Sequence, residues 1–213
     1  MPQGPVFDEA FREQFENLLR WRRDVRNFRA DAIDPRLIDH LIALASLAPS
    51  VGYSQPWRYI LVESSECRES IRLNFERCNQ KALSSYEGDK AELYAKLKLA
   101  GLRDAPVHLA VFLDAHTGHG SGLGRATMPE TLEYSAVLSV YTLWLAARTY
   151  GLGVGWVSIL DPAEASRGLR VPEEWKLIAY LCIGYPEEET PDPELFRHGW
   201  ETRLDQADLI LRR

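Results

Sequence analysis

Three arginines fall within five residues, at Arg22, Arg23 and Arg26, and are suited to bind a phosphate or the carbonyl oxygens of a bound ring. A guanidinium group presents its N–H donors in a planar fork that matches two acceptor oxygens at once. Arginines at the end of a helix also commonly do no more than complement the negative helix terminus. The cluster by itself therefore leaves both interpretations open, an anion site and a solvated helix end.

Two further segments place small or hydroxyl-bearing residues beside predicted elements. Residues 49–57 read PSVGYSQPW and lead from a helix into a strand, for which a plain loop is the alternative. Residues 151–158 read GLGVGWVS, and their glycines would let a planar ligand approach the backbone closely. This is not a dinucleotide fingerprint, because the glycines precede a strand, whereas that fingerprint follows a strand and opens a helix.

The apolar pattern predicts the elements that hold these segments. Helical periods over residues 7–21 and 35–49 flank the arginine cluster, and the second begins at a proline after an aspartate. Residues 132–148 are apolar on nearly every face, which is typical of a helix buried on all sides, often at a dimer interface. Short apolar runs predict four strands, over residues 59–62, 107–113, 154–159 and 177–183.

Composition narrows the class of protein. The chain has 213 residues, of which 46% are hydrophobic, and no internal repeat or regular βαβ pattern, so we expect one α+β domain over residues 1–213. A net charge of −6 without long charge runs argues against nucleic acid or a membrane surface as partner. No apolar stretch is long enough for a membrane span and no leader pattern is visible, so we expect a cytoplasmic protein. His116 and His119 lack an evident third ligand, so no metal is expected.

The order and separation of the three segments resemble the nitroreductase superfamily, whose members bind FMN at a homodimer interface. Residues 22–28, RRDVRNF, match its opening motif, and residues 49–57 match its PSxxNxQPW loop, with Tyr53 in place of the asparagine. Residues 151–158 match its glycine-rich turn. The resemblance covers almost the whole chain. It implies an α+β, FMN-binding fold with a mixed central sheet flanked by helices, a homodimer, and an extended C-terminal arm over residues 194–213.

The resemblance also implies roles for individual residues. Arg22 and Arg23 would hold the phosphate and ribityl end of FMN, Arg203 would be a second phosphate ligand, and Arg26 would face the pyrimidine edge of the ring. Ser158 would lie near flavin N5. The residues that the resemblance places around FMN are Arg22, Arg23, Asp24, Val25, Arg26, Pro49, Ser50, Val51, Ser54, Gln55, Leu99, Gly155, Trp156, Val157, Ser158 and Arg203.

Two positions depart from ordinary nitroreductases. Asp24 replaces a small hydroxyl residue, and a carboxylate beside a phosphate-binding arginine pair suggests proton transfer; Ser158 replaces a glycine. With residues 97–102, 124–130 and 155–160, they resemble the branch that makes 5,6-dimethylbenzimidazole, the lower ligand of vitamin B12. That branch implies reduced FMN and O2 as substrates, erythrose 4-phosphate as second product, a separate flavin reductase as supplier, and Asp24 and Ser158 as catalytic residues.

Two other functions remain open at this point. An NAD(P)H-dependent nitroreductase or flavin reductase would share the fold, the FMN and the dimer, but would need an open nicotinamide pocket. A non-catalytic flavin-binding protein would make Asp24 and Ser158 incidental. Residues 78–100 are a candidate lid, which would shield oxygen chemistry from water.

Overall fold

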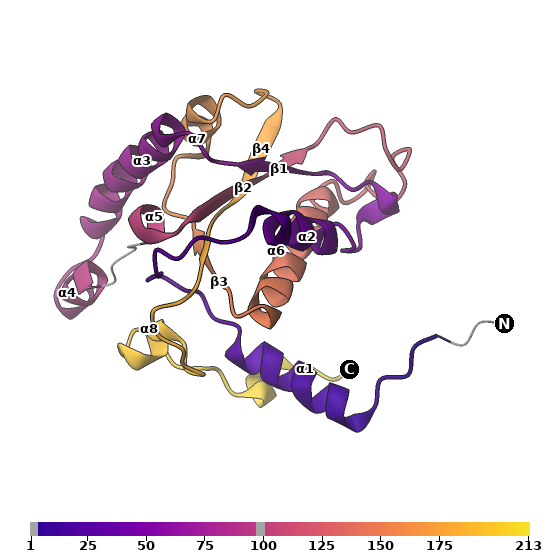
Figure 1. Cartoon of the computed structure of the whole chain (residues 1–213), viewed down its shortest axis with the longest axis horizontal. Coiled ribbons are helices and arrows are strands. Elements are labelled where there is room, and N and C mark those ends of the chain that lie inside the picture. Colours follow the sequence, from indigo (N-terminus) through magenta and orange to yellow (C-terminus); the bar gives the residue numbers. More distant parts are fainter. Residues whose placement is uncertain (1–3, 97–100) are drawn as a thin grey trace.

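A computed structural model describes residues 4–96 and 101–213 (Figure 1). In chain order its elements are α1 (Glu9–Trp21), α2 (Pro35–Ala45), η1 (Val51–Tyr53), β1 (Trp57–Leu61), α3 (Ser65–Leu83), α4 (Asp89–Lys96), α5 (Gly101–Asp104), β2 (Val107–Asp114), α6 (Thr131–Thr149), β3 (Gly153–Val157), α7 (Pro162–Gly168), β4 (Trp175–Gly184), α8 (Glu194–Arg197) and η2 (Gln206–Leu209). No helix in these two ranges is long and apolar enough to cross a membrane.

The four predicted strands form one sheet in the order β1-β2-β4-β3. The α+β class is confirmed, but the sheet differs from the mixed one expected, because each neighbouring pair of strands is antiparallel. Among the described residues, parallel pairing is confined to an isolated bridge between Asp24 and Val154. The parallel partner of β3 is therefore a short loop segment, which makes too few ladder bonds to form a fifth strand.

Local side-chain chemistry explains where the helices begin. The Asp8 carboxylate accepts a hydrogen bond from Phe11 N–H at the start of α1, and Asp34 accepts one from Arg36 N–H at the start of α2. Such caps satisfy backbone donors that have no partner inside a helix. Ser64 caps α3 in the same way, although that helix was not expected from the apolar pattern. Its polar sequence buries few residues, which is why periodicity did not reveal it.

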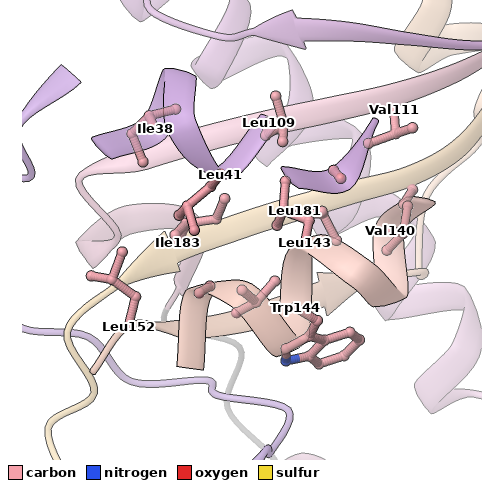
Figure 2. Close-up of a cluster of buried hydrophobic side chains, with 14 of the residues drawn as sticks. Ile38, Leu41, Leu109, Val111, Val140, Leu143, Trp144, Leu152, Leu181 and Ile183 are labelled. Atoms are coloured by element: carbon pink, nitrogen blue, oxygen red, sulfur yellow. The ribbon is translucent and has the colours of Figure 1, made fainter. Parts of the chain in front are cut away.

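The strands alternate between two apolar layers, because successive side chains of a strand point to opposite faces. One layer joins α2 and α6 to the sheet, with Leu41 and Leu143 packed on Leu109 and Leu181 (Figure 2). The other layer joins α3, α5 and α7 to the second face, through Phe112 and Tyr180 among others. The sheet is thus covered by helices on both faces, as Figure 1 shows.

Helix α6 is not buried on every side within one chain. Its inner face is buried from Leu132 to Ala147. Its outer face exposes four large apolar side chains by 39–53%, namely Tyr134, Val137, Leu138 and Tyr141. The all-round apolar pattern therefore combines a core face with a second apolar face that the chain itself leaves uncovered.

His108 is one of the buried titratable groups of the second layer. Only 2% of it is exposed, and its Nδ1 lies 2.9 Å from the Tyr180 hydroxyl. Burial lowers the pKa of His108 to about 4, from an ordinary value of 6.5. His108 is therefore a buried, hydrogen-bonded residue of the core.

We therefore expect folding stability to depend on His108 in mildly acidic solution. Below pH 6.5 the unfolded chain binds a proton at this residue, whereas the folded chain resists protonation down to about pH 4. The free energy of unfolding should fall in this window by about 1.4 kcal/mol per pH unit, or about 3 kcal/mol in all. Urea unfolding of the native protein and His108→Gln between pH 7 and pH 4 measures this. An unchanged pH slope in the variant would contradict it.

Candidate functional site

The arginine-rich segment runs alongside β3. Val25 N–H donates to the Val154 carbonyl at 3.1 Å, which forms the parallel bridge next to Asp24. The Asp24 carboxylate accepts a hydrogen bond from Trp156 N–H, with 3.0 Å between Oδ1 and N. The segment is therefore held to the strand by both its backbone and the Asp24 side chain.

Two glycines of β3 make this close approach possible. A Cβ at Gly155 would lie 2.2 Å from the Val25 carbonyl oxygen, and a Cβ at Gly153 would lie 2.6 Å from the Val25 side chain. Both separations are far inside van der Waals contact. On the side where a side chain would project, the space is filled by Val25, so the two glycines allow the arginine segment to pack closely on β3.

Phe28 anchors the far end of the segment. It is 2% exposed and packs against Gly101 and Gly184, where a Cβ would lie 2.8 Å and 3.0 Å from its ring. An isolated bridge joins Phe28 to Pro186. This bridge brings the acidic loop that follows β4 beside the arginines.

Arg22 and Arg23 lie on Trp144 of α6. The Arg22 guanidinium lies 5.0 Å from the centre of the Trp144 ring, and the indole N–H donates to the Arg23 carbonyl at 3.0 Å. Within the described ranges, the buried Nε atoms of both arginines lack a hydrogen-bond partner. Buried donors are rarely left unpaired, because each lost hydrogen bond costs about 1–3 kcal/mol. These two donors therefore fit an anionic ligand.

The charges divide the arginines into two groups. Burial lowers the pKa of Arg23, and the nearby positive charges of Arg22 and Arg203 lower it further, so Arg203 lies close to the pair. Arg26 instead lies between two carboxylates, with Nε 3.4 Å from Asp24 and 3.8 Å from Glu194. The nearby charge of Asp192 opposes this lowering of the Arg23 pKa. Arg22, Arg23 and Arg203 thus bring three positive charges together beside one carboxylate, whereas Arg26 is paired with Asp24 and Glu194.

Arg22, Arg23, Asp24 and Arg26 line a cavity of about 360 Å³, near the lower end of the range typical of small-molecule sites. Its wall includes two pairs of charged residues that the sequence did not single out. Arg148 forms a two-point ion pair with Glu189, at 2.9 and 3.0 Å, and Arg197 lies 3.6 Å from Glu188. The cavity thus joins residues 22–27 to the loop after β4.

The PSVGYSQPW loop contacts α6 at a different position from the arginines. Val51 N–H donates to the Ser135 hydroxyl at 3.0 Å, whereas the arginines contact Trp144, nine residues further along α6. At 1.5 Å per residue the two contacts are about 14 Å apart along the helix axis. Ser54 in this loop is 3% exposed, and its hydroxyl has no partner among the described residues. One chain therefore presents two separate groups of predicted flavin-binding residues.

The two predicted catalytic residues occupy different environments. Burial raises the pKa of the Asp24 carboxyl above its ordinary value, and the hydrogen bond from Trp156 N–H and the charge of Arg26 oppose that shift. Ser158 is exposed just beyond the end of β3. It lies two residues past Trp156, about 7 Å along an extended chain. Leu99, a further predicted contact, lies outside the described residues.

The candidate lid contacts the C-terminal arm through aromatic rings. Tyr86 stacks on Tyr94 with ring centres 4.9 Å apart, and Trp200 meets Tyr86 edge-on at 5.5 Å. The Tyr94 hydroxyl donates to the Asn79 side chain at 2.8 Å. Three residues after Trp200 comes Arg203, so these rings link the lid segment to the arm that carries this arginine.

Comparison with known proteins places the chain in a family. The sequence model of the protein family described as "Nitroreductase family" matches residues 19–185 of this chain. The chain is 54% identical over 203 residues to the 5,6-dimethylbenzimidazole synthase of Rhodospirillum rubrum, covering 95% of this chain and 96% of that protein. A synthase of the same name from Rhodobacter capsulatus is 48% identical over 93% of this chain and 96% of its own length. The chain belongs to the 5,6-dimethylbenzimidazole synthases of the nitroreductase family.

Solved structures confirm the fold of this synthase family member. The iodotyrosine deiodinase structure with bound FMN and 3-iodo-L-tyrosine superposes with a TM-score of 0.72, at 24% identity, over 92% of this chain and 97% of that one. A nitroreductase-like protein from Streptococcus mutans gives a TM-score of 0.70 at 18% identity, over 95% of this chain and 98% of that one. At these identities the likeness concerns the fold alone.

Proposed function

We propose that this enzyme converts reduced FMN and O2 to 5,6-dimethylbenzimidazole and erythrose 4-phosphate, with the pyrimidine half of the flavin ring released as a further fragment. The observation that carries the proposal is its identity of 44–54%, over at least 93% of the chain, with three proteins named for that synthesis. Reduced FMN is then a substrate that a separate flavin reductase supplies, and the reaction takes place in the cytoplasm.

The arginine cluster suits the phosphate of FMN. Arg22 and Arg23 have buried Nε donors without partners in the described ranges, and Arg203 adds a third positive charge nearby. A phosphate dianion would supply both the acceptors and the charge that this cluster lacks. Asp24, on the same segment, would then lie close to the ribityl chain that joins the phosphate to the ring.

The flavin site is proposed to form between two copies of the chain. The arginines and the PSVGYSQPW loop contact α6 at Trp144 and Ser135, so the two groups lie about 14 Å apart along the helix within one chain. If the exposed apolar face of α6 packs on its partner about a two-fold axis, the loop of one subunit comes to the arginines of the other. Such a dimer would also cover the apolar side chains that one chain exposes.

Asp24 and Ser158 are proposed to direct the chemistry after binding. Reduced flavin supplies the electrons for the reduction of oxygen. Asp24 would remove a proton from ribityl C1′ or from a sugar hydroxyl, and the raised pKa of its carboxyl brings it closer to working pH, which suits a general base. Ser158 would donate a hydrogen bond near flavin N5 and steer the reaction toward ring opening.

The dimer can be tested on the outer face of α6. Leu138→Glu places a charge at the centre of the proposed interface and should yield monomers with little FMN binding. Leu73→Glu is the matched control, because Leu73 on α3 is 41% exposed and Leu138 is 43% exposed. Sedimentation and FMN titration measure both properties. A monomeric native protein that binds FMN one to one would disprove the shared site.

The phosphate assignment predicts a difference between FMN and riboflavin. Arg23→Ala should weaken FMN binding by about 1.5–3 kcal/mol, the range for a hydrogen bond to a charged group, and leave riboflavin binding nearly unchanged. Arg29→Ala is the control, because Arg29 is paired with Asp31 on the surface of the same segment. Quenching of flavin fluorescence gives the affinities. Equal affinity of the native protein for FMN and riboflavin would exclude a phosphate site.

The roles proposed for Asp24 and Ser158 predict that their variants bind FMN but form little benzimidazole. Asp24→Asn retains an acceptor for Trp156 N–H, so it should bind FMN nearly normally, yet it should make benzimidazole about 10²–10⁴ times more slowly. Ser158→Gly should also bind FMN and return most reduced flavin to intact FMN in air. Asp31→Asn is the control. Mass spectrometry of the products and the flavin spectrum follow the outcome.

Normal product yield from Asp24→Asn would remove Asp24 from the mechanism. Loss of FMN binding in that variant would make it a structural residue instead. If the native protein itself forms no benzimidazole from reduced FMN in air, the proposed function is wrong.

A further inference from the structure

The PSVGYSQPW loop is held in an unusual backbone conformation. Gly52, Tyr53 and Gln55 all have positive φ, at 56°, 56° and 44°. Left-handed backbone is unfavourable for residues with a Cβ, and it persists where the surrounding structure determines it, often at functional sites. Contacts with neighbouring residues must therefore hold Tyr53 and Gln55 in this conformation.

The glycine-rich segment of residues 114–125 packs directly on this loop. A Cβ at Gly120 would lie 2.4 Å from the Gly52 carbonyl oxygen, and a Cβ at Gly52 would lie 2.5 Å from the Leu123 carbonyl oxygen. A Cβ at Gly124 would lie 2.9 Å from Val51. The two loops thus meet backbone to backbone, at a distance that only glycine allows.

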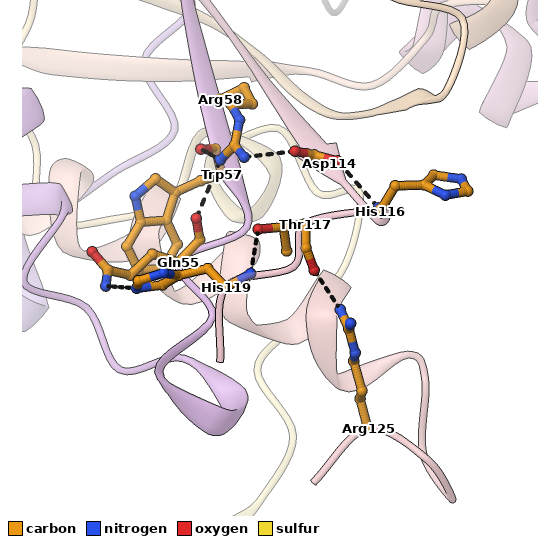
Figure 3. A network of polar contacts seen from close by, with 8 residues as sticks. All are labelled: Gln55, Trp57, Arg58, Asp114, His116, Thr117, His119 and Arg125. Atoms are coloured by element: carbon orange, nitrogen blue, oxygen red, sulfur yellow. Dashed lines mark hydrogen bonds and ion pairs between the residues drawn. The ribbon is translucent and has the colours of Figure 1, made fainter. Parts of the chain in front are cut away.

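Polar contacts fix the glycine-rich segment in turn (Figure 3). Asp114 forms an ion pair with Arg58 of β1 at 2.6 Å, and Arg125 donates to the Thr117 carbonyl at 3.2 Å. Thr117 is buried, and its hydroxyl accepts from His119 N–H at 3.3 Å. His119 is therefore placed by its own backbone against the PSVGYSQPW loop.

The His119 ring contacts the Gln55 side chain. His119 Nε2 lies 3.3 Å from Gln55 Nε2, and the same amide group donates to the Tyr53 carbonyl at 3.4 Å. An amide nitrogen can only donate, so His119 Nε2 must accept and the ring carries its proton on Nδ1. Both amide hydrogens are then used in contacts with His119 and Tyr53, and Gln55 Oε1 has no hydrogen-bond partner among the described residues.

His116 provides a contrast within the same segment. Both histidines are exposed, and the His116 backbone N–H donates to the Asp114 carboxylate at 3.1 Å. The His116 ring forms no hydrogen bond within the described residues, and Figure 3 shows it directed away from Gln55. Two histidines three residues apart therefore have different surroundings, and His119 alone contacts a residue expected at the flavin.

We propose that His119 is a positioning residue for the flavin site. It accepts a hydrogen bond from the Gln55 amide and so orients Gln55 Oε1 to accept from an N–H group of the flavin ring. This rests on the proposed function, which brings the PSVGYSQPW loop to the flavin. No direct contact between His119 and the flavin is required.

Three substitutions of His119 separate this role from simple packing. His119→Ala removes the acceptor and should weaken FMN binding roughly two- to tenfold, the range for one hydrogen bond. His119→Gln offers a carbonyl oxygen near the position of Nε2 and should restore most of the affinity. His119→Lys fills the space but can only donate, so it should bind FMN as weakly as the alanine variant. His116→Ala is the control and should match the native protein.

Fluorescence titration with oxidised FMN and benzimidazole formation from reduced FMN are measured for all five proteins. Equal affinities for His119→Ala and His116→Ala would overturn the inference, as would a glutamine variant no better than the lysine variant. Failure of the native protein to make benzimidazole would instead count against the proposed function. The native protein thus tests the function, and the comparison among variants tests the inference.

Discussion

Val25 lies so close to β3 that neither Gly153 nor Gly155 could carry a side chain without moving it. The functional site depends on this contact. It places Val25 N–H on the Val154 carbonyl and the Asp24 carboxylate on Trp156 N–H. The Asp24 carboxylate is thereby fixed and partly desolvated, and the desolvation raises its pKa although the hydrogen bond from Trp156 N–H opposes that shift. A larger residue at either glycine would displace the whole arginine segment.

The arginines held in this segment differ in their electrostatic surroundings, and the difference favours an anionic ligand at Arg22 and Arg23. Arg26 is neutralised by Asp24 and Glu194, whereas Arg22 and Arg23 lie on Trp144 with buried donors that have no partner among the described residues. Positive charges held together in this way destabilise the free protein, and an anion would relieve both the repulsion and the unpaired donors. Proteins commonly accept such local instability where function requires it.

Helix α6 contacts both groups of predicted flavin-binding residues as well as the core. Its inner face builds the core with α2 and the sheet, and Trp144 and Ser135 receive the two groups of predicted binding residues. Its outer face is apolar and exposed in one chain. One helix can therefore stabilise the domain, hold two parts of a site and offer a surface to a second copy. The apolar pattern that suggested complete burial reflects these combined demands.

The sequence by itself determined the four strands to within two residues at each end, the helices α1, α2 and α6, and the family, because these follow from local periodicity, caps and motif spacing. It did not reveal the polar helix α3. Only the tertiary structure decided that Val25 packs on Gly153 and Gly155 of β3 and that Trp144 contacts Arg23 while His119 contacts Gln55. It also decided that Arg26 is paired with carboxylates, whereas the buried Nε atoms of Arg22 and Arg23 have no partner among the described residues. The physical reason is distance along the chain: Trp144 meets Arg23 across 121 residues, and His119 meets Gln55 across 64. Packing creates such contacts, and no local pattern of residues encodes them.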